Sequence, residues 1–461
     1  MEHTAEISKM STTPVGKLML TMGLPMILSM MLQAVYNIVD SAFVSNMPQT
    51  GEAALNALTL AFPMQMLMVA ISIGTGVGAN ALLSKSLGQQ DGEKANRVAG
   101  NALFLAAVIY IVFLLFGLFG VSPYIAGQTG NAAIREMAEE YLKICCILSP
   151  GIVFFSIYEK LLQATGRSLY STIAQVAGAV TNMILDPIMI YGLLGCPQFG
   201  VKGAALATVI GQWISLLLAL IFHRKVNREI SSRLCYWKPS GRLILQIYTI
   251  GLPAIIAQAL MSVMTYGLNR ILGTVSESMV TAYGLYYKIQ QFILFAAFGL
   301  RDAITPIVSY SHGMGSKSRI RAGIRYGMLY TFFIMAMGTL LIELFAAPLS
   351  QLFRLAPETE SLCISAMRII SISFVFAGVN IAFQGIFQAL DGGLESLILS
   401  LFRQILFVLP VAWALVQIKG APSWLVWITF PIAEGLTALI GCLLMRRVSR
   451  KIRRLSDEAP A

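Results

Sequence analysis

Residues 181–212 read TNMILDPIMIYGLLGCPQFGVKGAALATVIGQ, and this stretch decides the class of fold. It joins the apolar stretches 169–194 and 202–222, each of which is long enough to cross a bilayer as a helix. The first of them nevertheless contains Asn182 and Asp186, and Pro187 follows the acid at once. A carboxylate inside an apolar span costs about 2.5 to 3.5 kcal/mol on insertion scales, so it marks a candidate functional site.

The rest of the chain has the same apolar character. Of 461 residues, 57% are hydrophobic and only 12% are charged, whereas a soluble protein carries about 25% charged residues. This composition argues against a water-soluble enzyme and a disordered chain, and it predicts an all-α polytopic membrane protein. The apolar stretches predict twelve transmembrane helices: 16–44, 53–83, 98–121, 134–158, 169–194, 202–222, 243–271, 279–308, 326–348, 361–389, 397–416 and 422–445.

Charge in the connecting segments predicts the orientation. Most Lys and Arg of these segments lie on one side of the alternation, which includes the loop 223–242 and the C-terminal tail. The positive-inside rule then places both termini and this loop in the cytoplasm of a bacterial-type plasma (inner) membrane. We attribute the net charge of +11 to the basic residues that set this orientation. Because no basic stripe alternates with aromatic residues, we expect the lipid bilayer and not a nucleic acid as partner. We expect a monomer as the default oligomeric state.

Other chemistries have weak support in the sequence. The six cysteines include no CxxC pair, the three histidines do not cluster, no Walker motif occurs, and the N-terminus shows no cleavable signal peptide. We therefore expect neither an enzyme nor a cofactor.

The chain repeats itself at an offset of 225 residues. Polar and glycine positions of the first half recur in the second: Gln65, Gly74 and Ser84 return as Gln290, Gly299 and Ser309. Two halves of six spans each have the same orientation, which is a parallel repeat and typical of transporters. We expect an N-lobe at 1–222, a cytoplasmic linker at 223–242, a C-lobe at 243–447 and a basic tail at 448–461.

Two polar stripes lie in the first half. In the first span the stripe has members at i, i+3, i+4 and i+7, which share one helix face: Gln33, Tyr36, Asn37 and Asp40. In the fifth span Gln175, Asn182 and Asp186 also share a face. Two carboxylates and an amide facing one cavity make an oxygen-rich cation site, which could hold a proton or Na⁺. The alternative is that each acid caps a helix or bonds to a neighbouring span.

The second half lacks an acid in the equivalent stripe. Its first span presents Gln258 and Asn269 on a polar face, and its fourth span presents Asn380 and Gln384. These amides could hydrogen-bond a ligand without charge, or they could join helix to helix.

Four charged residues of the second half need partners. Arg301 and Asp302 are adjacent, so we expect them to point to different faces and to have separate partners. We expect Arg403 and Glu434 to form a buried structural ion pair between neighbouring spans.

These motifs together resemble the MATE (multidrug and toxic compound extrusion) family over essentially the whole chain. The resemblance is carried by the GLP opening (23–25) with Gln33 and Asp40, by GTGVGANALLSKSLGQQDGEKA (74–95) and, most specifically, by the stretch 181–212. PIVSYSHGMGSKSRIRAG (306–323) and QALDGG (388–393) complete the match.

The resemblance implies a fold, an activity and a site. The fold is two pseudo-symmetric six-helix bundles arranged as a V, which rock between outward and inward states. The activity is export of organic cations or other amphiphiles in exchange for H⁺ or Na⁺. The family's cation site matches Asp40, Asn182, Asp186 and Thr208, and its first-helix Gln and Tyr match Gln33 and Tyr36.

One position differs from a branch of the family and indicates which branch this chain resembles more closely. The NorM-type branch has a Glu in the seventh span, whereas here residues 257–264 contain no acid and Met261 takes that position. The chain therefore resembles the DinF-like branch more closely, where coupling depends on the N-lobe aspartates. A lipid-linked precursor flippase of the same superfamily is the alternative, supported by Lys288, Arg301 and Arg403. A channel or a sensor without turnover is a third possibility.

Overall fold

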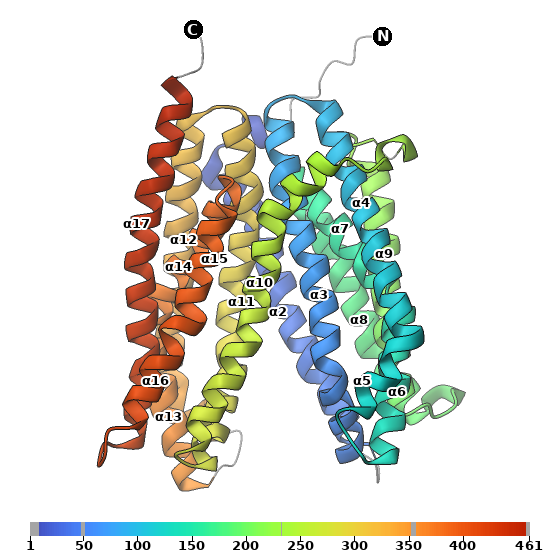
Figure 1. The fold of residues 1–461 in the computed structure, drawn as a ribbon, viewed down its shortest axis with the longest axis vertical. Coiled ribbons are helices and arrows are strands. Elements are labelled where there is room, and N and C mark those ends of the chain that lie inside the picture. Colours follow the sequence, from blue (N-terminus) through green and yellow to red (C-terminus); the bar gives the residue numbers. More distant parts are fainter. Residues whose placement is uncertain (1–8, 48–50, 232, 352–355, 458–461) are drawn as a thin grey trace. The chain divides into compact units, whose positions relative to one another are not determined.

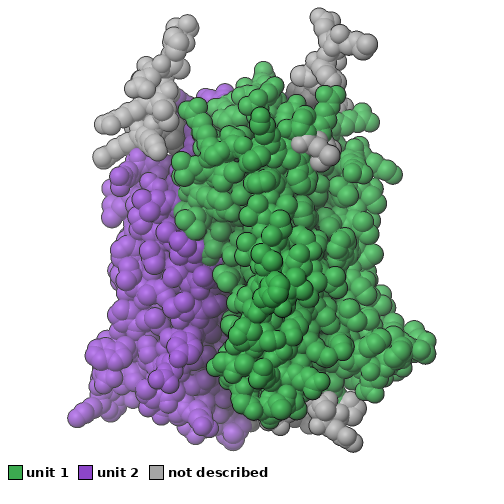
Figure 2. Space-filling model, turned by 45° about the vertical axis from the view of Figure 1, so that its right-hand side comes forward, with its two compact units in different colours: residues 1–10, 28–255 green, residues 11–27, 256–461 purple. Residues whose placement is uncertain are grey.

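The computed structural model describes residues 9–47, 51–231, 233–351 and 356–457, and these residues contain helices but no β-strand (Figure 1). Their contacts divide them into two compact units, coloured separately in Figure 2. Unit 1 contains residues 9–10 and 28–255, and unit 2 contains residues 11–27 and 256–457. Each unit encloses its own core of buried apolar side chains.

Unit 1 is built from the helices of the first half. It holds α3 (Gly51–Gly88), α4 (Gly92–Leu115), η1 (Phe116–Gly120), α5 (Val121–Ala126), α6 (Ala132–Ile147), α7 (Pro150–Ala164), α8 (Ser168–Tyr191), η2 (Leu193–Gly195), α9 (Val201–Val226) and η3 (Leu234–Trp237). The second part of α2 (Val15–Ser45) and the first part of α10 (Gly241–Gly273) complete it. The short α1 (Lys9–Thr12) precedes α2.

Unit 2 is built from the helices of the second half. It holds α11 (Glu277–Gly313), α12 (Lys317–Gln351), α13 (Pro357–Ser371), α14 (Phe374–Ala389), α15 (Gly393–Leu401), η4 (Phe402–Leu406), α16 (Val408–Val416), η5 (Ser423–Ile428) and α17 (Thr429–Asp457). The division differs from the expected lobes, since the expected linker 223–242 falls within unit 1 and two segments are exchanged. Residues 11–27, which include the start of α2, group with unit 2, and residues 241–255 of α10 group with unit 1.

Within the described residues, ten helices are long and apolar enough to cross a bilayer, and up to twelve spans result when each of two bent helix pairs counts as one. The pair α6 and α7 bends by 45°, and the pair α13 and α14 bends by 53°. The predicted stretch 134–158 ends too early, because α7 continues to Ala164. Pro150 stands at the start of α7, where proline favours a new helix over continuation of the old one.

The internal repeat is present as repeated hydrogen bonds between helices. In unit 1 the hydroxyl of Ser84 on α3 donates to the carbonyl of Ala164 on α7, at 3.2 Å. In unit 2 the hydroxyl of Ser309 on α11 donates to the carbonyl of Ala389 on α14, also at 3.2 Å. The two donor residues are 225 positions apart in the sequence, and so are the two acceptor residues. The predicted repeat is therefore confirmed as a repeat of helix packing.

Glycines on α3 and α11 let these two helices pack closely against their neighbours. A Cβ on Gly74 of α3 would lie 2.3 Å from Cγ1 of Ile255 on α10. The equivalent Gly299 of α11 contacts α2 in the same manner, since a Cβ there would lie 2.7 Å from the backbone nitrogen of Ile27. The glycines of the GTGVG motif thus permit close helix packing, as we expected from the sequence.

Candidate functional site

The two predicted acids of unit 1 meet within their unit. Asp186 lies on α8 and is fully buried, and Asp40 lies on α2 and is partly buried. Their carboxyl groups are within hydrogen-bond reach of each other. Oδ1 of Asp40 is buried and has no hydrogen-bond partner among the described residues. Two bare carboxylates this close repel each other, so the pair is suited to sharing a proton or a cation.

Asn182 joins this acid pair to α9. In the amide orientation that satisfies both of its polar atoms, Nδ2 donates to Oδ2 of Asp186 at 3.1 Å. Its Oδ1 accepts hydrogen bonds from the hydroxyl of Thr208 at 3.3 Å and from the backbone N–H of Thr208 at 2.9 Å. The hydroxyl of Tyr36 is also within hydrogen-bond reach of Thr208. The structure therefore brings Tyr36, Asp40, Asn182, Asp186 and Thr208 together.

A seam of glycines lets α8 and α9 approach closely enough for these bonds. A Cβ on Gly178 of α8 would lie 2.5 Å from the carbonyl oxygen of Gly211 on α9. A Cβ on Gly211 would lie 2.6 Å from the carbonyl oxygen of Gly178. Further along, a Cβ on Gly203 would lie 2.4 Å from the carbonyl oxygen of Met189. Residues with side chains at these positions would separate Asn182 from Thr208.

The other predicted polar residues of the first half form a neighbouring layer. Nε2 of Gln175 on α8 donates to Oε1 of Gln33 on α2 at 3.3 Å. The hydroxyl of Ser29 donates to Oε1 of Gln175. The side chain of Asn37 lies outside the described part of the structure, so its predicted role stays a prediction.

Sequence reasoning missed several members of this region. Ser29 lies four residues before Gln33 on the same helix face, and that spacing could have identified it. On α3, Nε2 of Gln65 donates to the hydroxyl of Tyr141 at 3.3 Å and to Sγ of Cys145 at 3.2 Å. Tyr141 is close enough to Asp40 and Tyr36 to interact with them electrostatically. Neither Tyr141 nor Cys145 belongs to a polar stripe, so the sequence had no signal for them.

The predicted amides of the second half occupy different surroundings. Nδ2 of Asn380 on α14 donates to Oε2 of Glu434 on α17 at 2.7 Å. Nε2 of Gln384 donates to the hydroxyl of Ser400 on α15 at 2.9 Å. Both therefore join helices, which is the alternative that the sequence left open. Gln258 is exposed within unit 2, and Oδ1 of Asn269 is buried without a partner among the described residues.

Glu434 is the centre of a buried ion pair in unit 2. Nε of Arg403 donates to Oε1 of Glu434 at 2.6 Å, and both side chains are 9% exposed. The predicted structural pair is thus confirmed. The described residues contain no group of three or more His, Cys, Asp or Glu side chains that could hold a metal ion.

Comparison with known proteins agrees with the fold and with the repeat. The model of the MatE family matches residues 25–188 and again residues 253–414, which is most of the chain. The chain belongs to the MATE family. It is accordingly a multi-pass membrane transporter and not an enzyme.

Curated relatives are similar to this MATE protein along nearly their whole length. This chain is 24% identical over 436 residues to the multidrug export protein MepA of Staphylococcus haemolyticus, and the match covers 95% of this chain and 94% of the relative. MepA of Staphylococcus aureus strain MRSA252 is 25% identical over 434 residues, covering 94% of each chain.

Solved structures give the same result. The structure of an outward-facing multidrug resistance MATE transporter has a TM-score of 0.91 at 26% identity, covering 98% of this chain and 100% of that one. A MOP superfamily transporter from Pyrococcus furiosus has a TM-score of 0.89 at 26% identity, covering 97% and 99%.

Each half of this MATE protein also packs a basic side chain against a glycine of a neighbouring helix. In unit 1 a Cβ on Gly76 would lie 2.8 Å from Cγ of Lys160. In unit 2 a Cβ on Gly385 would lie 2.9 Å from Cγ of Arg301. Under the repeat, Gly76 corresponds to Arg301 and Lys160 corresponds to Gly385. The basic residue has thus changed helices between the halves while its surroundings are kept.

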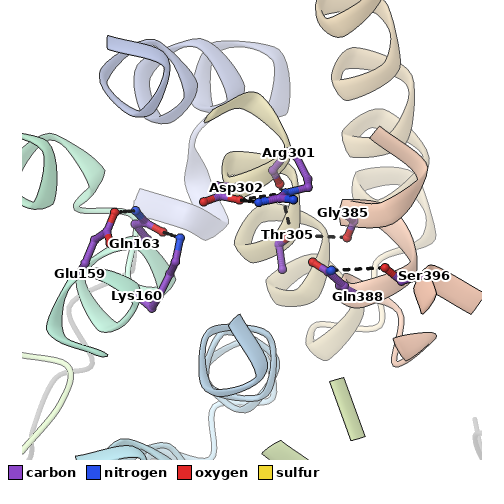
Figure 3. A network of polar contacts seen from close by, with 9 residues as sticks. All are labelled: Glu159, Lys160, Gln163, Arg301, Asp302, Thr305, Gly385, Gln388 and Ser396. Atoms are coloured by element: carbon purple, nitrogen blue, oxygen red, sulfur yellow. Dashed lines mark hydrogen bonds and ion pairs between the residues drawn. The ribbon is translucent and has the colours of Figure 1, made fainter. Parts of the chain in front are cut away.

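Figure 3 shows the hydrogen bonds around these two basic residues. Nζ of Lys160 donates to Oε1 of Gln163 at 3.0 Å. Nη2 of Arg301 pairs with Oδ1 of Asp302 at 2.8 Å, which corrects our expectation of separate partners. The flexible arginine side chain bends back toward the next residue and also lies over the ring of Phe298, 4.9 Å from its centroid. Adjacent positions therefore did not prevent this pairing.

Proposed function

We propose that this MATE protein exports organic cations and other drug-like amphiphiles in exchange for H⁺ or Na⁺ by alternating access. The observation that carries the proposal is the pair of carboxyl groups of Asp40 and Asp186, which lie within hydrogen-bond reach of each other. Asp186 lies inside a candidate span, and Asp40 lies on α2 just after the candidate span that ends at Tyr36. The MepA relatives are multidrug export proteins by name, which supports the substrate class.

The coupling ion binds at the acid pair. A proton or Na⁺ relieves the repulsion between the two carboxylates. Nδ2 of Asn182 on α8 donates a hydrogen bond to Asp186, and the Thr208 hydroxyl on α9 supplies a neutral oxygen nearby. A carboxylate pair attracts a cationic substrate for the same reason, so ion and cargo compete for the same negative charge. Exchange requires that each ligand bind the two transport states with different affinity.

The cargo contacts polar side chains of both halves. In the first half these are Gln33, Tyr36 and Gln175, whereas Asn37 of the same stripe belongs to the cation site with Asp40. In the second half Gln258 and Asn269 are the free candidates, while Asn380 and Gln384 contribute through the helices that they join. The protein acts as a monomer in a bacterial-type inner membrane with both termini in the cytoplasm, and it needs no cofactor besides the coupling ion.

Transport by purified protein in liposomes tests the exchange. Wild-type protein should accumulate ethidium only when a pH or Na⁺ gradient is imposed, and swapping the two gradients identifies the ion. Asp40→Asn and Asp186→Asn should each abolish gradient-driven uptake. Glu93→Gln is the matched control, because it makes the same change at an exposed acid on α4, and it should retain uptake. Full uptake by both aspartate variants would refute the coupling role of the pair.

The flippase alternative has less support. A cavity for a lipid pyrophosphate needs an excess of positive charge. Arg403 is paired with Glu434 and Arg301 with Asp302, so neither contributes a free positive charge. The acid pair of unit 1 would repel the pyrophosphate.

A further inference from the structure

A cavity with no part in the acid pair lies at the beginnings of two helices of unit 2. Its volume is about 490 Å³, and it opens between the first turns of α2 and the first turns of α12. Lys17 and Arg319 line it from the two helices, and both carry positive charge. Tyr326 and Tyr330 form an aromatic wall, with ring centroids 5.8 Å apart.

Specific contacts hold these walls in place. Nη2 of Arg319 donates to the backbone carbonyl of Thr13 at 3.1 Å, which ties α12 to the segment before α2. The ring of Tyr326 packs on the backbone of Gly16, since a Cβ there would lie 3.2 Å from its ring atoms. The cavity is therefore a formed site and not a gap between unrelated surfaces.

The surroundings of the cavity are positive. The two chain segments of unit 2 that contribute to it, residues 11–27 and 303–342, contain no Asp or Glu. The basic residues that line the cavity are Lys17 and Arg319. The start of α2 adds to this field, because its first helical bond runs from Leu18 N–H to the carbonyl of Pro14 and the earlier amides have no acceptor within the helix. This combination favours a phosphate group.

The cavity lies where two candidate spans begin, at Val15 and at Lys317. The start of a span is expected at the level of the lipid headgroups. Farther along the same helices the exposed side chains are apolar. Leu20 and Leu24 on α2 are 53% and 59% exposed, and Phe333 and Met337 on α12 are 60% and 58% exposed. Tyrosines are common at this boundary.

We propose that this cavity binds one anionic phospholipid. Lys17 and Arg319 contact the headgroup phosphate, Tyr326 and Tyr330 pack against the glycerol region, and the acyl chains lie along the apolar faces of α2 and α12. The proposal rests on the membrane location of the chain and is independent of the coupling ion and of the cargo.

Native mass spectrometry of the purified full-length protein tests the site. The protein is titrated in non-ionic detergent with phosphatidylglycerol and, separately, with phosphatidylcholine. Wild-type protein should bind the first phosphatidylglycerol selectively. Lys17→Gln/Arg319→Gln should weaken that binding about 30-fold, since each cation near an anionic lipid contributes about fivefold. Because Lys17 is exposed, Lys17→Gln alone should leave the fold intact and weaken binding about fivefold.

The matched control is Arg321→Gln/Arg325→Gln. It removes the same charge from exposed positions of α12 that do not line the cavity. It should change the affinity by no more than about twofold. Equal weakening by the two double variants, or equal binding of phosphatidylcholine, would overturn the proposal. Displacement of the lipid by millimolar inorganic phosphate would also overturn it, because the site would then bind free phosphate.

Discussion

Thr208 on α9 donates to Oδ1 of Asn182 on α8 through both its hydroxyl, at 3.3 Å, and its backbone N–H, at 2.9 Å. This double contact fixes the amide so that its other end faces Asp186. Through Thr208 and Asn182, the position of α9 sets the surroundings of the acid pair.

Thr208→Val keeps the size of the side chain and removes the hydroxyl. We expect gradient-driven ethidium uptake to fall about tenfold with normal expression, because Asn182 and Tyr36 both lose a partner and an unsatisfied buried polar group costs about 1 to 3 kcal/mol. Thr249→Val is the control, since the Thr249 hydroxyl is exposed and bonds only to its own helix at Leu245. Equal uptake by Thr208→Val and wild type would show that this hydroxyl does not support the site.

Gly178→Ala should force α8 away from α9. The added methyl would lie 2.5 Å from the carbonyl of Gly211, and overpacking of this kind costs about 1 to 3 kcal/mol. We expect a lower melting temperature in detergent together with reduced transport. Gly435→Ala is the matched helical control, because no atom lies within 4 Å of its added methyl. It should be neutral or stabilise slightly. A Gly178→Ala protein as stable as Gly435→Ala would contradict the close seam.

Glu434→Gln should destabilise unit 2. It leaves the Arg403 guanidinium buried without its counter-charge, which costs about 3 to 5 kcal/mol in comparable pairs. The double variant Arg403→Leu/Glu434→Leu should recover more than half of this loss, because no charge then remains buried. Thermal unfolding followed by fluorescence measures both. The exposed pair Arg97 and Glu93 provides the comparison, and its removal should have little effect. A double variant less stable than Glu434→Gln would argue against this account.

The native cysteines at the two ends of α9 test the orientation. Cys196 precedes α9 and Cys235 follows it, in the region expected to be cytoplasmic. In otherwise cysteine-free proteins, an impermeant maleimide applied to intact cells should label Cys196 and leave Cys235 unmodified. Permeabilised cells should label both, which confirms that Cys235 is accessible. Labelling of Cys235 alone in intact cells would reverse the predicted topology.

The sequence predicted the elements of this fold well because they depend on simple periodicity. The stripe from Gln33 to Asp40 follows from helix geometry alone, and so does the stripe from Gln175 to Asp186. The repeat offset predicted that Ser84 and Ser309 are equivalent, and their hydrogen bonds are equivalent in the structure. The bend between α6 and α7 was missed because the apolar run continues through it.

Contacts between helices were harder to predict, since they depend on which faces meet. The sequence does not show that Gly178 and Gly211 lie against each other, because this contact depends on how α8 and α9 pack. Tyr141 joins the surroundings of Asp40 from α6, where no polar pattern marks it. The pairing of Arg301 with Asp302 depends on a side-chain conformation, which residue spacing does not specify.

The helix α2 is shared, because its residues up to Ile27 group with unit 2 while Asp40 lies in the part that groups with unit 1. One residue inserted between Ile27 and Leu28 would turn everything after it by about 100° and advance it by about 1.5 Å. Either Asp40 would then turn away from Asp186, or Ile27 would no longer fit against Gly299. Because α2 is one helix from Val15 to Ser45, no loop lies between Ile27 and Asp40 to absorb the extra length.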